Sequence, residues 1–226
     1  MILSRPFCRA LLAIAVLLLA GCATTKPGYD YTAFRESRPK SILVLPPLND
    51  SPDVNATYSM YAQTTLPLAE SGYYVLPVTL VDEAFRQNGL TSPADIQQVP
   101  LKKLREIFGA DSALYIKVTH YGTKYMIISS ETRVSAEAKL VDLRSGATLW
   151  EGSATASSEE GNNNSSGGVV GLLVKAVITQ IADTLSNRGH PIAGITANRL
   201  LSAGRPNGIL YGPRSPKYQK DGSPAP

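Results

Sequence analysis

The stretch Ser41-Ile-Leu-Val-Leu-Pro-Pro47 decides the fold predicted for this chain of 226 residues. Its apolar residues are continuous rather than alternating, which is typical of a short strand buried on both faces. The two prolines end the strand. Helix-like and strand-like segments alternate after it, at 56–71, 73–77, 82–88 and 101–108, so the first half of the domain is predicted to be α/β.

Local signals place the ends of these helices. Pro67 lies inside the helix predicted over 56–71 and should distort or break it, and Gly72 suits its C-terminal cap. Ser92 can cap a helical turn that opens at Pro93. The helix over 101–108 ends at a glycine, as helices commonly do.

The second half of the chain is predicted to contain a meander of strands. Strands are expected over 113–120, 126–130 and 134–142, and a return strand begins at Thr148 after a turn over 143–146. Because these strands are consecutive and closely connected, they should pair antiparallel. The predicted fold class is therefore α/β, a mixed sheet with helices, followed by C-terminal helices over 169–185 and 191–201.

The beginning of the chain has the pattern of a bacterial lipoprotein leader. Arg5 and Arg9 form a positive region, and residues 10–20 are an uncharged apolar run. This run is shorter than the roughly 20 residues that span a bilayer, and it matches a signal peptide. Leu19-Ala-Gly-Cys22 then forms a lipobox, which predicts cleavage between Gly21 and Cys22 and a diacylglycerol and an N-acyl chain on Cys22. No other cofactor is expected.

Lipidation of Cys22 fixes several further expectations. Cys8 would be removed with the leader, so the mature chain can form no internal disulfide. Each buried methylene contributes about 0.8 kcal/mol, so two or three acyl chains attach the protein firmly to a membrane. Ala23 stands where an Asp commonly retains a lipoprotein at the inner membrane, and this favours the outer membrane, on its periplasmic face or at the cell surface.

The segment after Cys22 is predicted to be a tether of about 24 Å. Tyr29, Tyr31 and Phe34 are unusual for a linker, and docking of these aromatic residues onto the domain is favoured over contact with lipid. Residues 219–226 are expected to be disordered. The predicted organisation is a signal peptide (1–21), a lipidated tether (22–40), an α/β domain with C-terminal helices (41–205) and an extended tail (206–226).

Charge and motifs exclude several functions. Without Arg5 and Arg9, 20 basic residues face 18 acidic ones, and a net charge of +2 does not indicate nucleic acid as a partner. His120 and His190 are the only histidines, they are far apart in sequence, and no metal site is predicted. An enzyme would require one of them to meet a carboxylate and a nucleophile in one cleft. We therefore predict no catalytic residues and no enzymatic activity.

The predicted helix over 169–185 is apolar over most of its circumference. It can pack on the sheet as a core helix or form an oligomer interface, and the sequence favours neither over the other. Membrane insertion ranks last, because the helix is short and contains Lys175 and Asp183. As an interface it would make the protein a homodimer through Val170, Leu173, Val174, Val177, Ile178 and Ile181.

Seven stretches carry a family resemblance over nearly the whole mature chain. They are Tyr29-Asp-Tyr, Ser41-Ile-Leu-Val-Leu-Pro-Pro, Gly72-Tyr-Tyr-Val-Leu-Pro, Phe108-Gly-Ala-Asp, Lys139-Leu-Val-Asp-Leu-Arg-Ser-Gly, Ala197-Asn-Arg-Leu-Leu-Ser and Leu210-Tyr-Gly-Pro-Arg-Ser-Pro. In this order they resemble a bacterial lipoprotein family of unknown function that includes a meningococcal lipoprotein vaccine antigen. The resemblance supplies no catalytic residue set to carry over to this chain.

The resemblance implies a domain similar to the N-terminal domain of TolB and to the periplasmic part of the curli-secretion lipoprotein CsgG. It also implies a homodimer with C-terminal helices at the interface, and an assembly with a CsgG-like lipoprotein and another small lipoprotein. The expected function is a non-enzymatic, outer-membrane-anchored component of an envelope transport or secretion assembly. The alternative is an envelope binding module for a small ligand or peptidoglycan, which a deep apolar pocket with converging polar groups would indicate.

Overall fold

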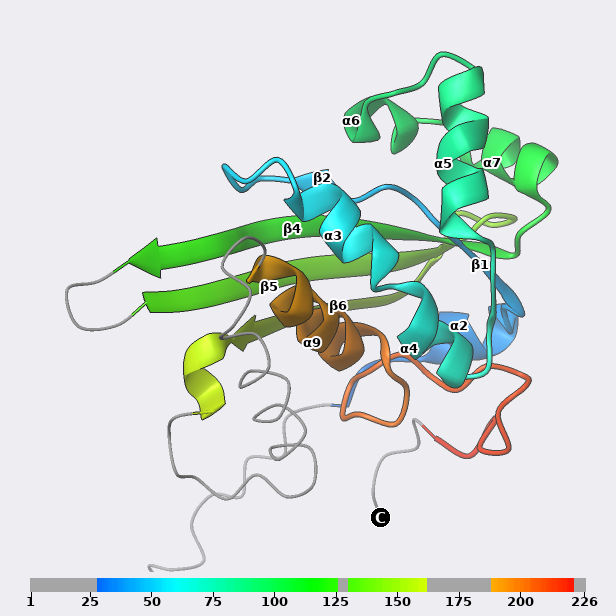
Figure 1. Cartoon of the computed structure of the whole chain (residues 1–226). Helices are drawn as coiled ribbons and strands as arrows, with labels where there is room; N and C mark the ends of the chain where they lie inside the picture. Colours follow the sequence, from blue (N-terminus) through cyan, green and yellow to red (C-terminus); the bar gives the residue numbers. More distant parts are fainter. Residues whose placement is uncertain (1–27, 126–129, 162–187, 222–226) are drawn as a thin grey trace, which may run out of the picture.

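The computed structural model describes residues 28–125, 130–161 and 188–221, which form a mixed six-stranded sheet with helices (Figure 1). In chain order the elements are α2 (Thr32–Ser37), β1 (Ser41–Val44), β2 (Leu48–Asn49), α3 (Ala56–Ala62), α4 (Thr65–Glu70), β3 (Tyr74–Val75), α5 (Val78–Gln87), α6 (Pro93–Ile96), α7 (Leu101–Phe108), β4 (Ser112–Tyr125), β5 (Ser130–Asp142), β6 (Thr148–Ser157), the 3₁₀ turn η1 (Ser158–Gly161) and α9 (Gly189–Leu201). The predicted α/β fold class with a mixed sheet is confirmed.

The sheet has the strand order β3-β1-β4-β5-β6, with β2 paired to β4. β1 pairs in parallel with β3 and β4, whereas β4, β5 and β6 form an antiparallel meander. The α/β half of the sequence therefore supplies the short strands β1, β2 and β3, and the second half supplies the long strands β4, β5 and β6, of which β4 joins the parallel part to the antiparallel part.

β1 is buried on both faces, as its continuous apolar run predicts. Ile42 and Val44 contribute to a large core between the sheet and the helices α3, α4 and α9. Leu43 and Leu45 belong to a second core, formed with residues of α5 and α7 such as Phe85 and Leu104. Figure 1 shows the resulting division: α3, α4 and α9 cover one face, and α5, α6 and α7 gather at the β1 end.

The helix predicted over 56–71 is two helices. α3 ends at Ala62 and α4 begins at Thr65, so the break lies before Pro67 rather than at it. A proline ring clashes with the carbonyl group four residues earlier, which here belongs to Gln63. Pro67 itself lies in the first turn of α4, where its missing N–H group has no helical partner to lose.

Other predicted boundaries also move. α5 begins at Val78, four residues before its prediction, and Ser92 occupies the N-cap position of α6 without a side-chain capping bond. The strand predicted over 113–120 extends over Ser112–Tyr125, and the one predicted over 134–142 begins earlier, at Ser130. Of the strand predicted over 126–130, residues 126–129 lie outside the described residues. α7 spans Leu101–Phe108 and ends at Gly109 with φ +65°, as predicted.

Both ends of the described chain pack on the domain, contrary to the boundaries predicted at 40 and 206. Tyr31 and Phe34 of the expected tether are buried, which agrees with the docking of its aromatic residues. In the expected tail, Ile209 and Leu210 are buried, and the amides of Gly212 and Arg214 donate to Ser71 O and Gly72 O. The folded unit therefore includes residues 29–38 and continues to Asp221.

Candidate functional site

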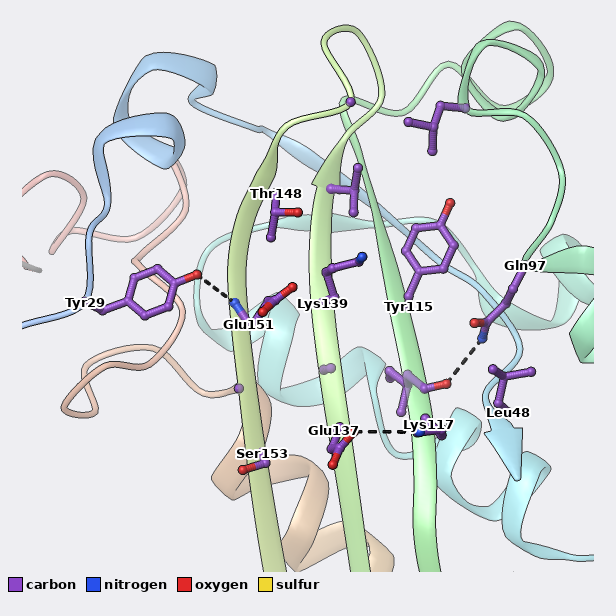
Figure 2. Close-up of a pocket in the computed structure, with 16 residues that line it drawn as sticks. Tyr29, Leu48, Gln97, Tyr115, Lys117, Glu137, Lys139, Thr148, Glu151 and Ser153 are labelled. Atoms are coloured by element: carbon purple, nitrogen blue, oxygen red, sulfur yellow. Dashed lines mark hydrogen bonds and ion pairs between the residues drawn. The ribbon is translucent and has the colours of Figure 1, made fainter. Parts of the chain in front are cut away.

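The candidate site is the face of β4, β5 and β6 that points away from α9. Strand alternation sends Val134, Ala136 and Ala138 into the core, so their neighbours point to the opposite face. Two rows of side chains cross that face. The register aligns Tyr115, Lys139 and Glu151 in one row and Lys117, Glu137 and Ser153 in the next. Figure 2 shows these side chains on one surface of the three strands.

These rows form the floor of an open groove of about 1070 Å³. Tyr29 forms its wall beside β6, and Gln97 and Leu48 form the wall beside β4 (Figure 2). The Gln97 amide nitrogen donates to Pro46 O at 2.9 Å and Ile116 O at 3.2 Å. The Tyr29 hydroxyl accepts a bond of 3.0 Å from the backbone N–H of Glu151. Both walls are therefore fixed to the strands by hydrogen bonds.

The charged groups of the floor differ in how they are paired. Lys117 Nζ lies 3.5 Å from an Asp50 oxygen and 4.0 Å from a Glu137 oxygen, and all three side chains are largely exposed. Such exposed pairs contribute little stability. Lys139 and Glu151 are direct cross-strand neighbours, yet no ion pair joins them in the described part of the chain. Their charges remain available to a partner.

Tyr115 lies beside Lys139 on the same face. Burial raises the pKa of its phenol further above the ordinary value of 10.0, and the hydroxyl is a neutral donor and acceptor at neutral pH. The groove thus offers a hydroxyl, an ammonium and a carboxylate within two neighbouring rows. This arrangement suits hydrogen bonding and ion pairing with a polar partner surface, as at the polar part of protein interfaces.

The two histidines lie on opposite sides of the sheet. Tyr121 faces the α9 side, where its ring packs against Gly189, so the adjacent His120 points to the other face. His190 Nδ1 lies 2.9 Å from Ser59 Oγ, and its Nε2 lies 2.8 Å from the side-chain amide of Gln63. A Ser–His contact therefore exists without the carboxylate that a triad needs, and it connects α9 to α3.

Several predicted site residues cannot be placed. The cleavage and lipidation residues Gly21 and Cys22 lie outside the described residues, as do all six residues predicted for the interface (Val170, Leu173, Val174, Val177, Ile178 and Ile181). Within 28–125, 130–161 and 188–221, no three His, Cys, Asp or Glu side chains gather as metal ligands would. No helix in these ranges has the length and apolarity to cross a membrane.

Sequence reasoning missed the groove. Glu137 and Lys139 occupy the polar positions of an alternating strand, which usually mark a solvated face. One signal in the sequence does point to an open face. No helix is predicted between the strands of the meander, so no such helix could cover it. The walls could not be found in this way, because Tyr29 and Gln97 reach the groove from distant parts of the chain.

The fold and the groove define a class: an α/β domain with a mixed sheet, in which helices cover one face of β4, β5 and β6 and an open groove lies on the other face of these strands. Residues 29–214 match the family described as "Putative lipoprotein GNA1162-like", and the chain belongs to this family. The match includes residues 29–40 and 206–214, in agreement with the folded boundaries of the structure.

The relatives support this assignment. The chain is 55% identical to "Putative lipoprotein NMB1124/NMB1162" of Neisseria meningitidis serogroup B over 201 residues, covering 88% of this chain and 93% of the relative. Its sequence is 57% identical to that of lipoprotein GNA1162 from Neisseria meningitidis, which has a crystal structure. That match covers 65% of this chain and 100% of that chain, with a TM-score of 0.53. A PelC dodecamer from Paraburkholderia phytofirmans is 16% identical over 80% of this chain and 96% of that chain, with a TM-score of 0.39.

Proposed function

We propose that this lipoprotein is a non-enzymatic, outer-membrane-anchored component of an envelope transport or secretion assembly, and that it binds a partner protein through the groove. The lipobox at Leu19–Cys22 and membership of a lipoprotein family support the anchor. Ala23 after the cysteine favours the outer membrane. The named relatives imply no enzymatic activity.

The observation that carries the proposal is the face of β4–β6 without helices. Antiparallel strands commonly leave one face to solvent, and here helices cover one face of the long strands. Tyr29 and Gln97 wall the other face, which makes it a groove rather than a flat surface. The groove is open, and it combines Tyr115 with charges that have no internal ion pair at Lys139 and Glu151. An open polar surface with aromatic residues suits a protein partner better than a small molecule, which requires enclosure.

The assembly itself remains part of the proposal. The Val169–Leu185 segment is proposed to join two copies into a homodimer, and Cys22 to carry diacylglycerol and an N-acyl chain. A CsgG-like lipoprotein and another small lipoprotein are the proposed partners. The alternative of a small-ligand or peptidoglycan module requires a deep pocket, and the groove is not one.

The test uses the full-length lipidated protein in cells. A photocrosslinking amino acid at Ser153, on the floor of the groove, should give a crosslink to one defined envelope lipoprotein. The same amino acid at Arg86, exposed on α5, is the control and should not give that product. Crosslinks that are equal at both positions would contradict the proposal.

Charge reversal tests the same surface without a crosslinker. Lys139→Glu and Glu151→Lys should each lower co-purification of that lipoprotein about five-fold, because an exposed charged contact contributes up to about 1 kcal/mol. The double variant restores the net charge of the pair. Recovered co-purification would show that the total charge matters, and a continued loss would show that the position of each charge matters. Unchanged co-purification with both single variants, in protein that still folds, would overturn the groove as the docking site.

A further inference from the structure

Basic side chains gather where the two ends of the folded chain meet. Residues 35–40 and 211–221 hold six basic and two acidic side chains, whereas the rest of the chain after Gly21 holds 14 basic and 16 acidic ones. The six basic residues, called the basic patch below, are all exposed: Arg35, Arg38, Lys40, Arg214, Lys217 and Lys220. The small positive charge of the whole chain therefore conceals one strongly basic surface.

Contacts between α2 and the C-terminal segment join the two halves of the patch. Arg35 and Arg38, at the end of α2, line the same small cavity as Tyr211 and Gln219. Lys217 Nζ lies 5.4 Å from the centre of the Tyr211 ring. Figure 1 shows α2 and the C-terminal segment side by side, at the opposite end of the molecule from α5 and α6.

Tyr74 joins the remaining two residues of the patch. Its backbone N–H donates to Lys40 O at 3.0 Å, and the Arg214 guanidinium lies 5.3 Å from the centre of its ring. Lys40 and Arg214 therefore lie on either side of one aromatic residue, and the Tyr74 ring remains 47% exposed between them.

The patch has few counter-charges of its own. Asp221 is directed inward, since its Oδ1 is buried and its Oδ2 accepts a bond of 2.7 Å from the backbone N–H of Tyr211. Glu36 is the exposed carboxylate of the two ranges. The ion pairs among the described residues include none of Arg38, Lys40, Arg214, Lys217 and Lys220. A cluster of exposed cations in this state attracts a surface that carries many negative charges.

The proposed anchor selects one such surface. The lipid would be on Cys22, and the seven residue steps to Tyr29 span at most about 25 Å. Arg35 follows Tyr29 by six residues, so the patch can reach the membrane that holds the lipid. The short tether also keeps the local concentration of headgroups high. Tyr74 suits this place, because tyrosine is enriched at the level of the headgroups.

We propose that the basic patch binds the anionic headgroups of phospholipids in the membrane that carries the Cys22 lipid. This contact fixes which side of the domain faces the membrane and directs α5 and α6 away from it. The contact is electrostatic, so the charge of the headgroups decides it and salt weakens it. The inference rests on the proposed lipid anchor and is independent of docking at the groove.

The experiment measures energy transfer from the full-length lipidated protein to acceptor-labelled headgroups in vesicles. The vesicles are phosphatidylcholine, with or without one third phosphatidylglycerol. Because Cys22 is blocked by its lipid and Cys8 is removed with the leader, Pro216→Cys supplies one free thiol for the donor, within the patch. Transfer should rise at least two-fold with phosphatidylglycerol and fall back at 1 M salt, where charges are screened beyond about 3 Å. A donor at Gln87, exposed on α5, should show no rise.

Two double variants separate the patch from net charge. Lys40→Gln with Lys217→Gln removes two charges from the patch, and Lys102→Gln with Lys103→Gln removes two from α7. Each basic residue near an anionic surface strengthens binding about five-fold. The patch variant should therefore need several-fold more phosphatidylglycerol for the same rise in transfer, whereas the α7 variant should behave as the unmodified protein.

Either of two results would overturn the proposal: transfer from position 216 that is independent of phosphatidylglycerol and salt, or equal effects of the two double variants. Failure of the anchor is visible separately, as protein that does not sediment with phosphatidylcholine vesicles. In that case the patch still predicts sedimentation with the phosphatidylglycerol vesicles at low salt, and its absence would refute the patch as well.

Discussion

Asp142 connects the beginning of the domain to the turn between β5 and β6, and its replacement by Asn should destabilise the fold in a pH-dependent way. The side chain is only 3% exposed. Its Oδ1 accepts bonds from the amides of Arg144 at 2.7 Å and Ser145 at 2.8 Å. Its Oδ2 accepts from the hydroxyl of Ser37, the last residue of α2, and from the Arg144 guanidinium at 3.3 Å.

The magnitude follows from the pKa of Asp142. Burial opposes ionisation, but hydrogen bonds from Ser37, Ser145 and Arg144 outweigh it and lower the pKa from 3.8 to about 2. At 1.36 kcal/mol per pKa unit, this change corresponds to about 2 kcal/mol of folding free energy. Because the folded pKa is depressed, the contribution is present above about pH 4 and is lost as the pH falls towards 2.

The assay is urea unfolding followed by circular dichroism at pH 7 and at several values down to pH 2, on the chain without its first 22 residues. Asp142→Asn should unfold about 2–3 kcal/mol more easily at pH 7, and the difference should shrink as the pH falls below 4. Asp95→Asn, exposed on α6, is the matched control and should change stability by less than about 0.5 kcal/mol. A difference that is the same at pH 7 and pH 2 would refute the reasoning.

Three further predictions concern packing, the sheet edge and the anchor. Gly189→Ala would place its Cβ 2.4 Å from ring atoms of Tyr121, so thermal unfolding should show a loss of about 1–3 kcal/mol, whereas Gly28→Ala, with no atom within 4 Å, should show none. Tyr29→Phe removes the acceptor for the Glu151 amide at the sheet edge, and hydrogen exchange of that amide should become several-fold faster; unchanged exchange would contradict the contact. Cys22→Ala should abolish fractionation with membranes and leave the circular dichroism spectrum unchanged, and persistent membrane binding would indicate a second anchor.

The local fold follows from sequence where one physical signal dominates. The continuous apolar run of β1 predicts burial on both faces, and Gly109 marks the end of α7 because it adopts φ +65°. The break that Pro67 predicts in the helix over 56–71 lies just before α4, since the proline ring acts on a carbonyl four residues earlier. Signals within a few residues of each other thus suffice for helices and strands.

Contacts across long sequence separations were not predictable in the same way. Tyr31 donates from its hydroxyl to Gly208 O, and the Trp150 indole donates to Asn207 O at 3.0 Å. Both contacts attach segments that composition alone assigned to a tether and a tail. Segments rich in proline, glycine and polar residues are predicted to be disordered. Here a few aromatic side chains hydrogen-bond or pack in the core and hold these segments on the domain.

Packing of Tyr29 and Tyr31 on the domain shortens the distance between the proposed lipid anchor and the domain. A free tether from Cys22 to Lys40 would separate the lipid from the domain by about 24 Å and leave the orientation of the domain undetermined. Because Tyr29 packs on the domain, only the seven residue steps between Cys22 and Tyr29 separate the two, and they can span at most about 25 Å. Tyr29 is also a wall of the groove. The proposed lipid on Cys22 would therefore keep the groove close to the membrane surface, where a partner that is itself lipid-anchored can reach it.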